Sequence, residues 1–347
     1  MFQLHHTPGR NVFVNDREML FFSGYAYLGL NLYPDFLRFV IEGMQQFGAV
    51  YPSSRISNTQ LELYSSVEKY LSELTHTTDT VLFQSGYMAG KAVTEIIPTD
   101  SIVYTSPVCH PAIRTHQPSE LSFIEWASQI VSNINSSHFT SPPVIVSDAV
   151  NPLTAEVFDF SFLNHIHQPV ICITDDSHGI GIIGKDGEGI SSRLPRKENI
   201  EYIISYSLSK AMSVQAGAVS CTNAATAKAL KAGNWFTATT PPSPAMLYAL
   251  LHSKHIFHRH RQQLADNLHF LQTAAASLPH IYFNEELPVI ILPENLDETY
   301  FAGHQIIISS FAYPNPQGKK INRAVISALH TKDDLQQLLN AIAKSSQ

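Results

Sequence analysis

The stretch "IEYIISYSLSKAMSVQAGAVSC", residues 200–221, combines a strand-like run with an isolated lysine. Its apolar first half is typical of a strand buried on both faces of a parallel sheet. Ser207, Ser209 and Lys210 follow where that strand ends, and the residues around the lysine are small. A lysine near a strand end is usually solvated, so this position alone does not define a site. The stretch predicts an α/β sheet with polar groups gathered beyond one of its edges.

The same pattern repeats along the chain. Helical spacing separates further apolar runs, as in LELYSSVEKYLSEL (61–74) and YMAGKAVTEII (87–97). This alternation predicts a large domain with a mostly parallel, mixed sheet flanked by helices, and a small α+β C-terminal domain. The runs that predict the other strands are TVLFQSG (80–86), SIVYTS (101–106), PPVIVSDAV (142–150), QPVICITDD (168–176) and GAVSCT (217–222).

We expect four segments. The first is peripheral, with a hairpin-like run and a helix, and the third is a linking helix within one long helical pattern over residues 245–278. The segments are residues 1–50 (peripheral), 51–250 (large domain), 251–278 (linking helix) and 279–347 (small domain).

Composition excludes several classes of partner. The chain has 347 residues, 44% of them hydrophobic, a net charge of −7 and no basic block, so nucleic acid and anionic membrane surfaces are not expected partners. Three scattered cysteines form no disulfide framework or zinc-like spacing. No apolar run approaches the roughly 20 residues of a membrane span, and the first residues lack a signal-peptide pattern. A cytoplasmic protein is the expectation.

Reactive residues cluster at the predicted strand ends. His110 follows one strand, Asp175 and His178 follow another, and the turn Ser85-Gly86-Tyr87 follows a third. In open α/β sheets, ligands bind beyond the carboxyl ends of the strands, so one crevice accommodates all of these groups.

These motifs also suggest three other kinds of site. The run Gly179-Ile-Gly181-Ile-Ile-Gly184 matches the dinucleotide fingerprint, but the glycine-rich continuation is unsuited to the helix that the fingerprint requires. Asp175, Asp176 and His178 are chemically suited to a metal, although no companion set accompanies them. The histidines of HSKHIFHRH (252–260) favour a solvated helix surface over a metal clip.

The chemistry of these residues favours a pyridoxal 5'-phosphate (PLP) site. PLP requires a lysine for the Schiff base and an acid that keeps the pyridine nitrogen protonated. Its phosphate requires hydroxyls and backbone N–H groups at a helix N-terminus. Lys210, Asp175, Ser207 and the turn at 85–87 supply these groups.

The motifs "DDSHGIGIIGKDGEGI" (175–190) and "SYSLSKAM" (205–212), at this separation, resemble those of α-oxoamine synthases. This family includes 8-amino-7-oxononanoate synthase, 2-amino-3-ketobutyrate ligase and serine palmitoyltransferase, within the fold type I PLP enzymes. The likeness runs from about residue 9 to the end of the chain.

The resemblance implies a role for each matching residue. Lys210 would form the Schiff base and move protons, Asp175 would pair with the pyridine nitrogen, His178 would bond the ring hydroxyl, and His110 would stack on the ring. The amino-acid carboxylate would bind Arg323, and members of the family are homodimers with shared active sites. The phosphate would be held by Ser85, Gly86, Tyr87 and Ser207, with Thr237 beside the position of a partner-chain threonine.

The departures from the family lie on the substrate side. Tyr25 stands where the family has an asparagine, Ala238 replaces the partner-chain threonine, and AVYPSSR (49–55) replaces a glycine-rich loop, keeping Arg55. The expected function is therefore PLP-dependent condensation of a small amino acid with an acyl-CoA, with loss of CO2, to give an aminoketone. The alternatives are transamination or other PLP chemistry on an amino acid, and a non-catalytic partner subunit.

Overall fold

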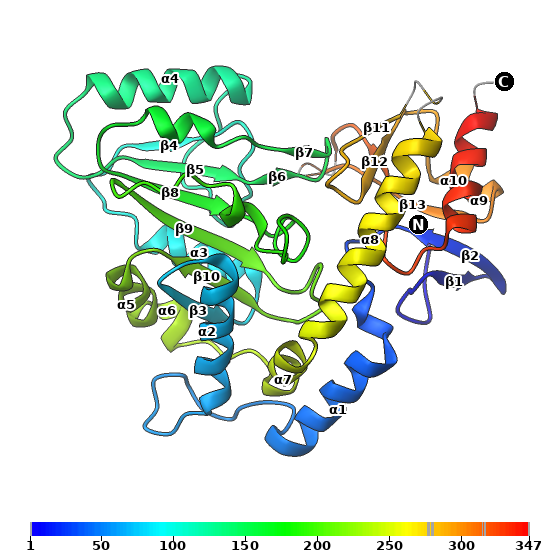
Figure 1. Ribbon diagram of the computed structural model, residues 1–347, viewed down its shortest axis with the longest axis horizontal. Coiled ribbons are helices and arrows are strands. Elements are labelled where there is room, and N and C mark those ends of the chain that lie inside the picture. The colour runs from blue at the N-terminus through cyan, green and yellow to red at the C-terminus, as the bar shows by residue number, and fades with distance from the viewer. Residues whose placement is uncertain (1, 276–277, 279–280, 314, 316, 346–347) are drawn as a thin grey trace.

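The computed structural model describes residues 2–275, 278, 281–313, 315 and 317–345. Figure 1 shows a larger sheet on the left and a C-terminal sheet on the right, with helix α8 between them. Five strands of the larger sheet run in the same direction, while β10 runs antiparallel to both of its neighbours. In sheet order its strands are β3 (Asp79–Phe83), β10 (Gly217–Cys221), β9 (Ile200–Ser207), β8 (Val170–Asp175), β5 (Val144–Asp148) and β4 (Val103–Thr105).

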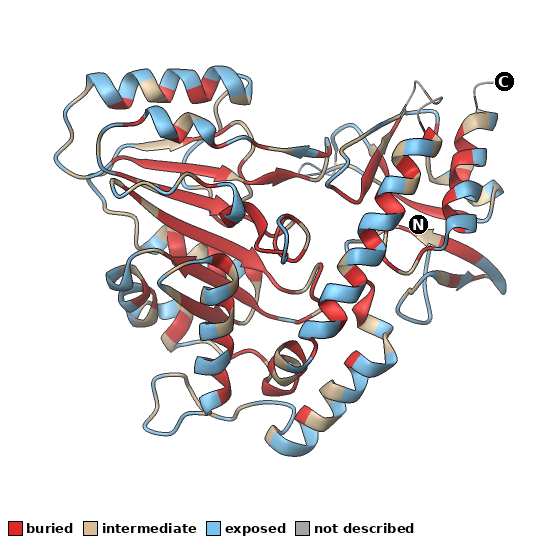
Figure 2. Ribbon diagram, in the orientation of Figure 1, coloured by how far each residue is buried: buried red, intermediate tan, exposed pale blue. Residues whose placement is uncertain are grey.

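The central strands of this sheet are buried almost throughout, as Figure 2 shows in red. Burial on both faces explains why these strands appear in the sequence as continuous apolar runs rather than alternating ones. The flanking elements are α2 (Glu62–Thr75), α3 (Gly86–Glu95), α4 (Phe123–Ser136), α5 (Ala224–Ala232), α6 (Asn234–Thr237) and the short helices η2 (Ser161–His165) and η3 (Gly189–Ser192).

The N-terminal hairpin belongs to the C-terminal sheet. Strand β2 buries Met19, Leu20 and Phe22, and it pairs in parallel with β13. A two-stranded hairpin is only marginally stable by itself, so these apolar residues need the additional strands. The sheet order is β1 (Asn11–Val14), β2 (Arg17–Phe22), β13 (Ile306–Phe311), β14 (Ile321–Val325), β12 (Val289–Leu292) and β11 (Tyr282–Phe283).

One expected helix is two helices. The pattern over residues 245–278 predicts a single long helix, but the structure breaks it at Ser253 into α7 (Pro244–His252) and α8 (Lys254–Ala275). The Ser253 N–H donates to Leu250, while its carbonyl accepts from Ile256 and Phe257 and so begins the next helix. Ser253 is fully buried, and its hydroxyl has no hydrogen-bond partner among the described residues, so the backbone alone forms this break. Residues 276, 277, 279 and 280 lie outside the described residues.

The remaining elements connect these layers. Helix α1 (Pro34–Phe47) packs against α7, and α10 (Lys332–Lys344) packs against α8. The short elements are η1 (Leu30–Leu32), the hairpin β6 (Val150–Asn151) with β7 (Glu156–Val157), and α9 (Glu298–Gly303). None of the helices within the described residues is both long and apolar enough to cross a membrane.

Candidate active site

The strand register brings the expected polar residues to one edge of the larger sheet. Asp148, the last residue of β5, is opposite Asp175, the last residue of β8, and Asp175 is opposite Ser205 near the end of β9. Ser207 ends β9, and the chain then turns to Lys210. The parallel strands therefore place two carboxylates and the lysine at the same edge.

Lys210 lies in a row of hydrogen-bonding groups. Its Nζ is 2.8 Å from His178 Nε2, and the Tyr27 hydroxyl is 2.7 Å from the other ring nitrogen, Nδ1. Burial lowers the pKa of Lys210 from 10.5 to about 8, although Asp175 and Asp148 act in the opposite direction. Burial, and next the charge of Lys210, holds the pKa of His178 well below its ordinary value. Both groups are therefore closer to neutral than they would be in water.

The buried Asp175 and the partly buried Asp148 form an acidic pair beside the lysine. Asp175 Oδ1 accepts the Ser177 N–H at 2.9 Å, and Asp148 Oδ1 accepts the His110 N–H at 2.8 Å. Burial, together with the charge of Asp175, raises the pKa of Asp148 to about 8. Burial lowers the pKa of His110, while Asp175 raises it. Burial therefore brings both the His110 imidazole and the Asp148 carboxyl group closer to their neutral forms.

The N-terminus of α3 forms the second part of the site. Ser85 caps this helix by accepting the Met88 N–H at 3.3 Å. A Cβ atom on Gly86 would lie 2.6 Å from the Ser207 Cβ, so this close approach requires glycine. The Ser207 hydroxyl is 2.8 Å from that of Ser209. Free N–H groups of a ten-residue helix next to two hydroxyls match the requirements of a phosphate.

The glycine-rich stretch after β8 is a turn, not the helix of a dinucleotide site. Gly181, Gly184 and Gly189 have positive φ values of 82°, 89° and 70°. Asp176, which is fully buried, accepts the Ile190 N–H at 2.8 Å, and a Cβ on Gly189 would lie 1.8 Å from its Oδ2. The glycines therefore allow the loop to fold onto Asp176.

Arg323 lies in the middle of β14 and is 7% exposed. Its Nη1 donates to the Pro152 carbonyl at 2.9 Å, and its buried Nε has no hydrogen-bond partner among the described residues. Because an unpaired buried guanidinium N–H is unfavourable, the geometry matches a site for an anionic group such as a carboxylate. The charge of Arg323 also acts to lower the pKa values of Lys210, His178 and Tyr27.

The side chains of three expected residues, Tyr25, Tyr87 and Thr237, lie outside this cluster within one chain. Tyr25 is 50% exposed, and Tyr87 at the start of α3 is similarly exposed. Thr237 ends α6, where its carbonyl accepts the Ser54 hydroxyl at 2.8 Å. Arg55 pairs with Glu68 at 3.0 Å rather than with a group of the cluster.

Two residues of the cluster were not among the expected ones. Asp148, like Asp175, is the last residue of a buried strand. An acid at the end of an apolar run could therefore have identified Asp148 from the sequence. Tyr27 reaches His178 across 151 positions of sequence, and no local pattern indicates that contact.

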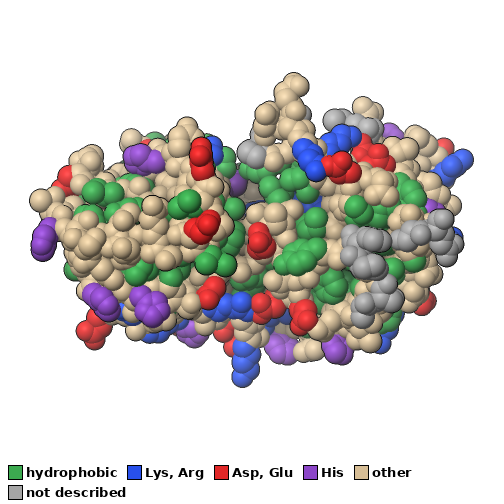
Figure 3. Space-filling model, turned by 90° about the horizontal axis from the view of Figure 1, so that it is seen from above, with side chains coloured by type: hydrophobic (Ala, Val, Ile, Leu, Met, Phe, Trp, Pro, Cys, Tyr) green, Lys and Arg blue, Asp and Glu red, His purple; other side chains and the backbone are tan. Residues whose placement is uncertain are grey.

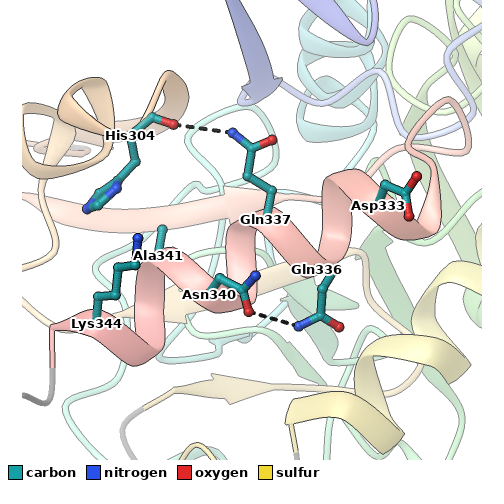
Figure 4. Close-up of a pocket in the computed structure, with 7 residues that line it drawn as sticks. All are labelled: His304, Asp333, Gln336, Gln337, Asn340, Ala341 and Lys344. Atoms are coloured by element: carbon teal, nitrogen blue, oxygen red, sulfur yellow. Dashed lines mark hydrogen bonds between the residues drawn. The ribbon is translucent and has the colours of Figure 1, made fainter.

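Hollows elsewhere on the surface lack this chemistry. Figure 4 shows one of about 350 Å³ along α10, where Gln337 donates to the His304 carbonyl and Gln336 to Asn340. A groove of about 750 Å³ runs between α4, β7, η2 and β11. Hydrophobic side chains gather over the middle of the face seen in Figure 3. Within the described part of the chain, no three His, Cys, Asp or Glu side chains are arranged to hold a metal ion.

Comparison with known proteins is consistent with this geometry. The 8-amino-7-oxononanoate synthase 1 of Bacillus subtilis (strain 168) is 23% identical over 368 residues, covering 99% of this chain and 92% of that protein. Serine palmitoyltransferase from Sphingomonas wittichii superposes with a TM-score of 0.85 at 14% identity, covering 99% of this chain and 92% of that one. The 8-amino-7-oxononanoate synthase of Francisella tularensis gives a TM-score of 0.72 at 22% identity, covering 94% and 98%.

These relatives confirm the resemblance to α-oxoamine synthases and the expected fold. The family model described as aminotransferase class I and II matches residues 24–342, which is most of the chain. The protein therefore belongs to the aminotransferase class I and II family.

Proposed function

We propose that this protein is a PLP-dependent enzyme that condenses a small amino acid with an acyl-CoA. The observation that carries the proposal is the buried cluster in which Lys210 faces His178 beside Asp175, next to the N-terminus of α3. The reaction forms a bond between the amino acid's Cα and the acyl carbonyl carbon. The thioester C–S bond and the bond from Cα to the carboxylate break, releasing CoA and CO2.

The residues present fit PLP. The close contact of Gly86 with Ser207 brings the N-terminus of α3 next to the hydroxyls of Ser207 and Ser209. A phosphate requires such a combination of N–H groups and hydroxyls. Asp175 supplies a carboxylate for the pyridine nitrogen, His178 a donor for the ring hydroxyl, and His110 a planar face. When bound, PLP supplies an electron sink for negative charge at the amino acid's Cα.

The chain's own groups bind the amino acid and move its proton. The Arg323 guanidinium has a free Nε–H and is held by Pro152, so its planar fork is ready to bind a carboxylate. Burial lowers the pKa of Lys210 Nζ to about 8, so this amine is suited to hold or release a proton near neutral pH. Its neutral form is also the nucleophile that PLP requires.

The acyl-CoA partner is supported by the relatives rather than by a pocket in a single chain. The relatives named 8-amino-7-oxononanoate synthase and serine palmitoyltransferase align with nearly the whole length of this chain. The exposed Tyr25 and the loop around Arg55 depart from the family's substrate side, so we propose that these residues influence which amino acid and which acyl chain the enzyme accepts.

The test is release of products. Glycine, alanine and serine are each incubated with acyl-CoA esters of increasing chain length, and free CoA and CO2 from the carboxyl-labelled amino acid are measured. We expect equal amounts of both from one pair, none from Lys210→Ala, and normal release from Lys228→Ala, whose lysine is exposed on α5. Keto acid formation without CoA release would instead identify a transaminase.

We also propose that the enzyme is a homodimer. Helix α1 exposes Leu37, Ile41 and Met44, which lie on one face at helical spacing, and Val50 and Ile56 in the following loop are also exposed. An exposed apolar surface of this kind is typical of an interface. Light scattering at several concentrations tests this: a dimer mass is expected, and Ile41→Glu would shift it toward the monomer.

The cytoplasm is the proposed location. Cys109, Cys172 and Cys221 are all free and buried, as is typical of a reducing compartment. Fractionation of the producing cells tests this proposal, with enrichment in the membrane fraction as the contrary outcome.

A further inference from the structure

The phenol of Tyr27 has one hydrogen-bond partner. Tyr27 is 2% exposed, and its hydroxyl lies 2.7 Å from His178 Nδ1. The described residues offer that hydroxyl no second hydrogen bond. A phenol has one proton, and a buried one needs an acceptor for it. Burial raises the pKa of Tyr27 to about 12, so the proton stays on the phenol at neutral pH.

The position of this proton determines the tautomer of His178. Because the phenol can donate only to Nδ1, that nitrogen must be the acceptor, and in a neutral imidazole the other nitrogen then carries the hydrogen. The Nε2–H points to Lys210 Nζ at 2.8 Å. An N–H can be accepted only by an amine that has a free lone pair, and an ammonium has none.

We propose that Tyr27 is a positioning residue that holds His178 as the Nε2–H tautomer, so that this N–H faces Lys210 and favours the neutral lysine amine. The inference deepens the proposed function and rests on it, because a neutral amine is what attacks the PLP aldehyde. Tyr27 itself touches neither the amine nor any expected substrate group; it acts through His178.

The backbone holds the phenol in place. The Tyr27 carbonyl accepts the Ala328 N–H at 2.9 Å, and its own N–H donates to Tyr25 at 2.8 Å. Two residues later, Gly29 has φ 64°, and a Cβ there would lie 2.3 Å from the Leu329 side chain. The turn that carries Tyr27 is thus packed tightly against the segment that follows β14. Such support is what a residue needs to orient another side chain.

Other charges also act on Lys210, and they come from several elements. The carboxylates Asp175, Asp148 and Asp176 favour the charged lysine, whereas Arg323 favours the neutral one. The charges of His110 and Lys210 both lower the pKa of His178. Substitution of Tyr27 leaves these groups unchanged. A shift in the pKa of Lys210 in that variant therefore measures the effect of the hydrogen bond between Tyr27 and His178.

Two measurements on the protein without PLP test the proposal. In wild type labelled with 15N-histidine and kept above pH 8, where the Lys210 amine is neutral, the signals of His178, assigned by their loss in His178→Asn, must show a proton on Nε2 and none on Nδ1. Reductive methylation of Lys210 with formaldehyde, followed by mass spectrometry across a pH series, measures the fraction of neutral amine. Neither measurement requires PLP binding or turnover, so failure of the proposed function would not change them.

The matched variants are Tyr27→Phe and Tyr206→Phe. Tyr206 is also buried and its hydroxyl is 2.7 Å from that of Ser220, whereas the described residues show no hydrogen bond between Tyr206 and His178. Tyr27→Phe should move the midpoint of Lys210 methylation upward by about 0.4–1 pH unit, the equivalent of one ordinary hydrogen bond. Tyr206→Phe should leave it unchanged. A proton on Nδ1 in wild type, or equal midpoints in wild type and Tyr27→Phe, would overturn the proposal.

Discussion

Replacement of Lys210 by methionine should stabilise the protein without PLP in a pH-dependent way. Burial lowers the pKa of Lys210 from 10.5 to about 8. Between these pH values the unfolded chain binds more protons at this position than the folded chain does, so wild-type stability rises with pH there. Below pH 8 the folded protein bears the full cost of a charged, desolvated lysine, and above pH 10.5 it bears none.

The size of the effect follows from this shift. At 1.36 kcal/mol per pH unit, the cost of the charged lysine is at most about 3 kcal/mol. The stability of Lys210→Met relative to wild type should therefore fall by about 2.5 kcal/mol between pH 7 and pH 10. Effects that do not depend on pH, such as a change in the packing of the side chain, cancel in this comparison. Ionisation of the buried tyrosines and cysteines is common to both proteins and cancels as well.

The assay is urea unfolding of both proteins without PLP at pH 7, 8, 9 and 10. The control is Lys228→Met, which removes an exposed lysine on α5 and should give a constant difference from wild type. A stability difference for Lys210→Met that is independent of pH, or that grows as pH rises, would refute the reasoning about the buried amine.

Three further predictions concern the supporting residues. Gly86→Ala places a Cβ 2.6 Å from Ser207, so it should cost about 1–3 kcal/mol of unfolding free energy and weaken PLP binding in a fluorescence titration. Glu68→Ala leaves the buried Arg55 without its partner and should cost about 3–5 kcal/mol, part of which Glu68→Leu combined with Arg55→Met recovers in thermal unfolding. Arg323→Lys loses the planar fork, so steady-state kinetics should show KM for the amino acid raised about tenfold or more, with a smaller change in kcat.

The larger sheet was predictable because its order is encoded locally. Strands β5, β8 and β9 are buried on both faces and appear as apolar runs, and polar residues at their ends mark the edge where a ligand binds. Asp175 and Lys210 were found in this way. Arg323 was identified through the family resemblance, since nothing in its local sequence indicates a buried guanidinium.

The long-range contacts were not predictable from local patterns. The pairing of β2 with β13 joins residues nearly 300 positions apart, and periodicity contains no information on which strands pair. The break at Ser253 was missed because the apolar spacing of α7 continues into α8, while the interruption depends on one buried serine backbone. Tyr27 was missed for the same physical reason as β2: its partner, His178, is close only in the folded chain.

The central claim is that Lys210 is the residue that holds PLP. The most direct measurement is borohydride reduction of the protein incubated with PLP, followed by peptide mass spectrometry. We predict one phosphopyridoxyl group per chain, located on Lys210, and none in Lys210→Ala. Labelling of a different lysine, or equal labelling of wild type and Lys210→Ala, would contradict the account.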